Sequence, residues 1–171
     1  ELETHVIMTY TDDVVIVCDS EHKLHQTLEL FQLLCAELEL NANVAKSAVM
    51  RIDPRSKAKT EVRPLPALAE QFRWQGVPIP LVKSYTYLGI ELQANLKWDI
   101  QVGNIVRKIR YAYHRIYPMI TDNKIPVGIK MRLVNAIVCP LATYGAEAWS
   151  PTRKDMEKIT KCISKIHRKV A

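Results

Sequence analysis

The chain lacks the long apolar runs and paired cysteines that are typical of membrane proteins and disulfide-rich proteins. No run approaches the roughly 20 apolar residues that span a bilayer, and no secretory signal pattern is present. The chain has four cysteines, scattered singly along it: Cys18, Cys35, Cys139 and Cys162. This spacing fits neither a metal site nor a short disulfide framework. We therefore expect an intracellular protein in a reducing compartment, nuclear or organellar, whose thiols are free and at least half-buried.

The chain also lacks an initiating methionine, because its first residue is Glu1. From this we expect a fragment, a processed product or one part of a larger protein. Its 171 residues are 48% hydrophobic, which is enough to bury a core in one domain or in two small ones.

Acidic and basic residues are divided unevenly along the chain. Residues 1–96 carry 9 Lys and Arg against 13 Asp and Glu, a net charge of −4, whereas residues 97–171 carry 15 against 5, a net charge of +10. Such asymmetry predicts a polyanionic partner for the C-terminal part, and nucleic acid is the usual one. The alternative is a set of ordinary solvated helix faces.

Residues 1–96 have the texture of a mixed α+β domain. A helix is predicted over 21–40, because Ser20 can cap it and apolar residues recur at helical spacing. The predicted strands are 4–9, 14–18, 48–52, 71–75, 79–83 and 85–92. The strand 14–18 is apolar throughout, which predicts that both of its faces are covered. Gly89 inside the last strand indicates a bulge or a close backbone approach.

Residues 97–171 read as an all-α bundle of three helices. The first is predicted to end at Pro118, the second to run from Pro126 to Pro140, and the third to open at Pro151. On the third helix one apolar stripe predicts the core face: Met156, Ile159, Ile163, Ile166 and Val170.

Basic residues on the first and third of these helices are the candidate nucleic-acid contacts. A stripe on the third helix repeats at helical spacing: Lys154, Lys158, Lys161, Lys165 and Arg168. The first helix adds Arg107, Lys108 and Arg115. Lysine and arginine arranged in this way would contact the phosphate backbone, largely without reading base sequence.

The segment Tyr10-Thr11-Asp12-Asp13 lies between the first two predicted strands. Two adjacent carboxylates at the tip of an apolar hairpin repel each other unless a cation or a basic partner intervenes. Hard divalent cations prefer carboxylate oxygens. The turn is therefore a candidate metal site.

Several segments, taken in order, resemble the reverse transcriptases of non-LTR retrotransposons, from the Y-x-D-D motif of the palm onward. Tyr10–Asp13 looks like that motif, and Tyr87–Ile90 resembles the primer-grip strand. A loop motif of the form L-N-x-x-K-T-x-x-M is similar to the segment that holds Leu40, Asn41, Lys46, Ser47 and Met50. The segments 95–98 and 140–149 look like the thumb region. This order extends over nearly the whole chain.

The resemblance implies an α+β fold in which residues 1–96 are the C-terminal part of a polymerase palm and residues 97–171 are a thumb-like bundle. It implies RNA-directed DNA polymerase chemistry on an RNA or RNA/DNA duplex. Asp12 would be the principal Mg²⁺ ligand and Asp13 the auxiliary one. Lys46 would lie near the leaving phosphates, while Tyr87, Leu88 and Gly89 would form a primer-grip-like element.

The family also uses a carboxylate from a strand upstream of the Y-x-D-D turn. Only nine residues precede Tyr10, none of them aspartate. Asp19 cannot replace this carboxylate. It lies about 20 Å beyond Asp13 along an extended strand, at ~3.3 Å per residue, which is too far to share a metal ion. We therefore expect that this chain alone does not polymerise and that an upstream reverse-transcriptase segment is its partner. The alternative is a domesticated, non-catalytic RNA-binding or scaffold subunit of a ribonucleoprotein, such as an organellar ribosome.

Overall fold

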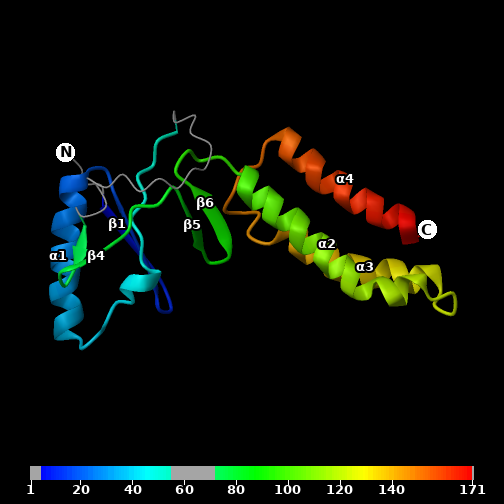
Figure 1. Ribbon diagram of the computed structural model, residues 1–171, viewed down its shortest axis with the longest axis horizontal. Coiled ribbons are helices and arrows are strands. Elements are labelled where there is room, and N and C mark those ends of the chain that lie inside the picture. Colours follow the sequence, from blue (N-terminus) through cyan, green and yellow to red (C-terminus); the bar gives the residue numbers. More distant parts are fainter. Residues whose placement is uncertain (1–4, 55–71, 171) are drawn as a thin grey trace. The chain divides into compact units, whose positions relative to one another are not determined.

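The structure is a computed structural model that describes residues 5–54 and 72–170. Within these residues, short antiparallel strand pairs accompany four α-helices, so the predicted α+β class is confirmed (Figure 1). No helix in the described part of the chain has both the length and the apolarity to cross a membrane.

The chain divides into two compact units. Among the described residues, the first holds 5–51 and 72–82, and the second holds 52–54 and 83–170. The hairpin at 84–93 thus belongs with the helices, whereas the sequence placed its division after residue 96. The palm and thumb labels remain predictions.

The first unit begins with an antiparallel pair, β1 (His5–Tyr10) and β2 (Asp13–Cys18). Their register pairs Tyr10 with Asp13, which leaves a two-residue turn. The prediction that both faces of β2 are covered is wrong, because Val14 and Val17 are exposed. In the described residues this sheet has two strands, and β2 packs against the following helix, so much apolar surface stays open to solvent.

Helix α1 (Glu21–Glu37) is capped by Ser20, whose side chain accepts a hydrogen bond from the backbone N–H of Lys23 (3.3 Å). The helix ends three residues before the predicted Leu40, and Glu39 adopts a left-handed φ of 56° just beyond it. Helix α1 contributes Cys35 to a small buried core, whose other members are Phe72, Trp74 and Ile79.

Among its described residues, the rest of the first unit has little regular structure. A 3-10 turn, η1 (Val44–Lys46), precedes a minimal hairpin of β3 (Arg73–Trp74) and β4 (Val77–Pro78). The predicted strand 48–52 is reduced to a single bridge between Val49 and Leu81. Proline in the facing segment explains part of this reduced strand pairing, since Pro78 and Pro80 have no backbone N–H to donate to a neighbouring strand.

The first regular element of the second unit, among its described residues, is the hairpin of β5 (Ser84–Tyr87) and β6 (Ile90–Gln93). The single strand predicted over 85–92 is therefore wrong, because the chain reverses at Leu88-Gly89. Both turn residues have a left-handed φ, 47° and 79°. Two-residue hairpins with the favoured twist need this conformation, and glycine adopts it without steric cost.

Three helices follow: α2 (Asp99–Thr121), α3 (Val127–Thr143) and α4 (Arg153–Val170). The predicted stops at Pro118 and Pro140 are wrong, because both prolines lie inside helices. Each is exposed and within one turn of its helix end, so the missing N–H and the clash of the ring with the preceding turn disturb the helix only close to where it stops. The Thr121 hydroxyl also donates to the last carbonyls of α2.

The core of the second unit lies where α2, α3 and α4 meet. Its most buried side chains are Val102 and Ile109 from α2 and Val134 and Val138 from α3. Helix α4 contributes Ile159, Cys162, Ile166 and Val170. Two predictions fail here: Met156 is exposed while Cys162 takes a core position, and the thiol-bearing Cys139 is exposed rather than buried.

Helix α4 begins with a reciprocal cap. The Thr152 hydroxyl donates to the Asp155 carboxylate (2.7 Å), and the backbone N–H of Asp155 donates back to the Thr152 hydroxyl (3.2 Å). Lys158 adds a hydrogen bond to the same carboxylate (2.9 Å). The hydrogen bonds from Thr152 and Lys158 favour the ionised form, so the pKa of Asp155 is lowered although the side chain is buried.

This cap predicts a pH dependence of folding stability. Because the folded-state pKa of Asp155 lies below its unfolded value of about 3.9, the ionised carboxylate stabilises the folded chain. That contribution is complete above about pH 5 and is lost as the pH falls through the folded-state pKa. We expect Asp155→Asn to lower the urea midpoint at pH 7, measured by circular dichroism, and to flatten its decline toward pH 2. Parallel curves for the two proteins would contradict this role.

Candidate functional site

The Tyr10–Asp13 turn presents two carboxylates at the tip of the first hairpin. Asp12 lies in the turn and Asp13 opens β2, and both are exposed. Thr11 has a left-handed φ of 52°, which is unusual for a β-branched residue, and its hydroxyl donates to the Tyr10 carbonyl (2.7 Å). The backbone here is therefore held in a costly conformation at the position that presents the acids.

The donor chemistry of this turn fits Mg²⁺. Mg²⁺ usually takes one or two carboxylates from the protein and completes its shell with waters and substrate phosphates. In residues 5–54 and 72–170, no group of three His, Cys, Asp or Glu side chains is placed to hold a metal. The turn therefore offers a metal two protein ligands, the carboxylates of Asp12 and Asp13. Lys46, predicted to lie near the leaving phosphates, ends η1 in the same unit with an exposed side chain. Its catalytic role, like those of Asp12 and Asp13, stays a prediction.

The primer-grip-like residues Tyr87, Leu88 and Gly89 form the end of the β5–β6 hairpin. The Tyr144 hydroxyl, just beyond α3, donates to the Leu88 carbonyl (2.9 Å). A Cβ at Gly89 would lie 3.2 Å from the Tyr144 ring, so glycine permits this close approach. The turn is thus fixed to the helices by a tyrosine 56 residues away in sequence.

Two buried glutamines join strand β6 of this hairpin to α2. Gln93 accepts a hydrogen bond from the backbone N–H of Ile100 (3.2 Å), which caps the first turn of the helix. Gln101 accepts one from the backbone N–H of Glu91 (3.0 Å). These contacts explain why the hairpin belongs to the helical unit.

Gly145 gives a test of this attachment. It has a left-handed φ of 66°, and an added Cβ would lie 2.5 Å from Ile90 Cδ1. We expect Gly145→Ala to destabilise the chain by about 1–3 kcal/mol, from backbone strain and overpacking. Gly128→Ala is the matched control, since a Cβ added there would have nothing within 4 Å, and it should be neutral or slightly stabilising. Thermal unfolding of both variants measures the difference, and equal effects would contradict the packing.

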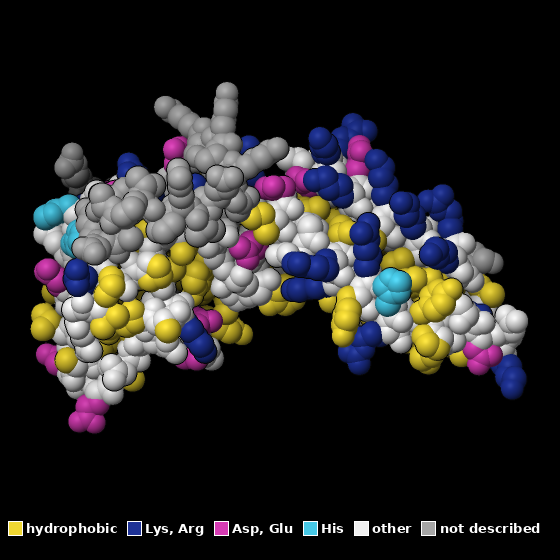
Figure 2. Space-filling model, viewed as in Figure 1, with side chains coloured by type: hydrophobic (Ala, Val, Ile, Leu, Met, Phe, Trp, Pro, Cys, Tyr) yellow, Lys and Arg dark blue, Asp and Glu magenta, His cyan; other side chains and the backbone are white. Residues whose placement is uncertain are grey.

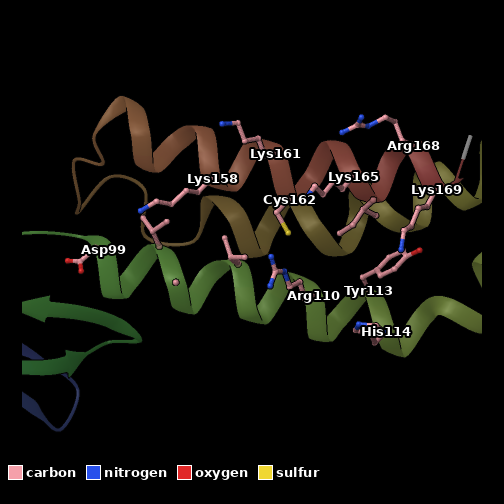
Figure 3. A pocket seen from close by; sticks show the side chains of 14 residues that line it. Asp99, Arg110, Tyr113, His114, Lys158, Lys161, Cys162, Lys165, Arg168 and Lys169 are labelled. Atoms are coloured by element: carbon pink, nitrogen blue, oxygen red, sulfur yellow. The ribbon is translucent and has the colours of Figure 1, made fainter. Parts of the chain in front are cut away.

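A groove of about 940 Å³ runs between α2 and α4. Its floor is apolar, formed by Val102, Val106, Cys162 and Ile166. Six cationic side chains line it: Arg110, Lys158, Lys161, Lys165, Arg168 and Lys169. Figure 2 shows Lys and Arg gathered along α4, and Figure 3 shows the two helices running in the same direction with their side chains around the groove.

The structure brings together only part of the predicted contact set. Lys158, Lys161, Lys165 and Arg168 line the groove. The other predicted residues are not among its lining: Arg107, Lys108, Arg115 and Lys154. Sequence reasoning missed Arg110, Tyr113, His114 and Lys169. Arg110 and His114 are four residues apart on one side of α2, a spacing that would have indicated a second basic face.

The electrostatics of the groove are strongly positive. Asp99 is the single carboxylate among the described residues that line it. Lys158 is paired with Asp155 (2.9 Å), and Lys161 lies 3.6 Å from Glu157, so part of the charge is already neutralised. Lys165 and Lys169, further along α4, have no ion-pair partner within the described part of the chain.

Comparison with known proteins gives two distant relatives. No protein-family model and no solved structure matches the chain. It is 24% identical over 165 residues to an uncharacterized transposon-derived protein of Caenorhabditis elegans, which covers 95% of the chain and 55% of that protein. It is 25% identical over 177 residues to the RNA-directed DNA polymerase from mobile element jockey of Drosophila melanogaster, which covers 99% of the chain and 18% of that polymerase.

These similarities support a distant relationship between the chain and retrotransposon reverse transcriptases. The chain spans about half the length of one relative and less than a fifth of the other. The activity, substrates and partners of the whole protein are therefore matters for proposal.

Proposed function

We propose that this chain is the C-terminal palm and thumb portion of a retrotransposon RNA-directed DNA polymerase, in which the second unit binds template and primer. The alignment with the jockey polymerase over 99% of the chain carries this proposal. The adjacent carboxylates at a hairpin tip and the basic groove are the two features that such an enzyme would use.

In this proposal the hairpin turn is the metal-binding end of the palm. Asp12 and Asp13 would hold Mg²⁺, which would activate the primer hydroxyl and neutralise the leaving pyrophosphate. The strained turn keeps both carboxylates exposed at the tip. Lys46 would supply positive charge toward the leaving group, and a further carboxylate would come from another segment of the polymerase.

The groove between α2 and α4 would bind the phosphate backbone. Lysines three or four residues apart on a helix are separated by about 5 Å along its axis, which suits successive phosphates. Contacts of this kind position a duplex without reading its sequence. The attached β5–β6 hairpin would then be held in a fixed relation to the bound strand, as a primer-grip-like element requires.

The metal role is tested in the complete protein that contains this chain. We expect Asp12→Asn to abolish primer extension, because it removes a ligand charge from the metal site. Asp19→Asn is the matched control, since Asp19 is exposed, pairs with Lys23 and lies outside the turn. Full extension by Asp12→Asn would refute the metal role of Asp12. If the unsubstituted protein binds RNA but shows no extension, the polymerase proposal is contradicted and a non-catalytic ribonucleoprotein subunit is favoured.

The groove is tested by the salt dependence of binding to an RNA/DNA duplex. We expect Lys161→Ala with Lys165→Ala to weaken binding and to reduce the slope of log K against log salt by ~0.7–0.9 for each lost phosphate contact. Lys124→Ala with Arg132→Ala removes the same charge from residues that do not line the groove. Equal losses of affinity and slope in the two double variants would show that general charge, rather than this groove, drives binding.

A further inference from the structure

At the end of the groove away from Asp99, which we call its far end, lies a buried tyrosine whose hydroxyl has no hydrogen-bond partner among the described residues. Tyr113 is 6% exposed and lines the groove from α2. Its hydroxyl is buried and has no hydrogen-bond partner in residues 5–54 and 72–170. Most buried polar groups are paired, and an unpaired one is costly. A hydroxyl left in this state, on a residue that lines a groove, would gain its missing partner from a ligand atom that reaches it from the groove.

The surroundings of Tyr113 define the charge of that ligand. Lys169 lies over its ring, 5.9 Å from the centroid (Figure 3). Arg110 lies one turn earlier on α2, and Lys165 one turn before Lys169 on α4, both lining the groove. The groove's carboxylate, Asp99, lies about 21 Å away along α2, at 1.5 Å per residue. Cations therefore dominate this end, and they favour an anion.

The hydroxyl sets the hydrogen-bonding character of the ligand. Burial first, and the neighbouring Tyr117 second, raise the pKa of Tyr113, so the phenol stays protonated at neutral pH. A protonated phenol can donate to an anionic oxygen, and such a bond is strong in a desolvated position. A phosphate group offers several acceptor oxygens, and the repeated cations along α4 match a ligand that carries phosphates at intervals.

We propose that the Tyr113 hydroxyl, with Lys165 and Lys169, forms a phosphate subsite at the far end of the α2–α4 groove and donates a hydrogen bond to one backbone phosphate of a bound nucleic acid strand. This inference rests on the proposed function, because it assumes that the groove binds nucleic acid. The neutral donor would fix the register of the strand, whereas the lysines would supply attraction at longer range.

The test compares Tyr113→Phe with the intact chain, using a fluorescein-labelled RNA/DNA duplex and fluorescence anisotropy. We expect affinity to fall about tenfold, because one hydrogen bond to a charged group is lost. The salt slope should stay unchanged, since no charge is removed. The melting temperature without nucleic acid should stay equal or rise, because the hydroxyl has no partner to lose among the described residues. A clear drop in melting temperature would overturn the inference.

Tyr111→Phe is the matched control. Tyr111 lies on the same helix, is 66% exposed and does not line the groove, so affinity should be unchanged. If the duplex binds and Lys165→Ala weakens it while Tyr113→Phe does not, the subsite is refuted and the proposed function stands. If Lys165→Ala also has no effect, the groove itself is refuted as the nucleic-acid site. If Tyr113→Phe lowers the affinity for polyglutamate by the same factor as the affinity for the duplex, the assignment to phosphate is overturned.

Discussion

The second unit depends on the burial of one apolar stripe of α2 between α3 and α4. Val102, Ile109, Val134 and Val138 are the most completely buried side chains of the described residues. Each contributes about 1.5–3 kcal/mol through burial. The same packing brings the basic sides of α2 and α4 to one groove, where like charges repel. Exposed charges interact by only about 0–1 kcal/mol each, so the core outweighs the repulsion and holds an open cationic surface ready for an anion.

The helices of this unit also fix the β5–β6 hairpin. Gln93 and Gln101 attach strand β6 to the first turn of α2, while Tyr144 attaches the hairpin turn to the chain after α3. These bonds involve buried or closely packed groups from separate elements of the unit. A hairpin of two short strands is marginal alone, so its conformation depends on the helices. Any role of Leu88 and Gly89 toward a bound strand therefore depends on the bundle as well.

Local signals in the sequence predicted much of this fold. The hairpin around Asp12 and Asp13 and the start of α1 at Ser20 followed from turn chemistry and capping, which act over a few residues. The errors at the helix ends arose because Pro118 and Pro140 lie at exposed positions within the last turn, where the helix continues past them. The predicted strand breaks at Gly89 because Leu88 and Gly89 adopt a left-handed hairpin turn, which lies close to Tyr144.

The candidate site was predictable only in part for the same reason. A single helix pattern identified Lys158, Lys161, Lys165 and Arg168, because they share one face of α4. It did not identify Arg110 or Tyr113, since their importance comes from α4 packing beside α2. The unsatisfied hydroxyl of Tyr113 is a property of the folded structure, and no residue pattern indicates it. The ordered motifs predicted a relationship to reverse transcriptases, and the two distant relatives support it.

The proposed function depends on nucleic-acid binding at the α2–α4 groove. The most direct measurement is a residue-resolved NMR titration of the ¹⁵N-labelled chain with a short RNA/DNA duplex. We expect the largest amide shift changes to cluster at the groove, at Arg110, Tyr113, Lys165 and Lys169. Changes confined to the exposed residues of α3, or the absence of changes at saturating duplex, would contradict it.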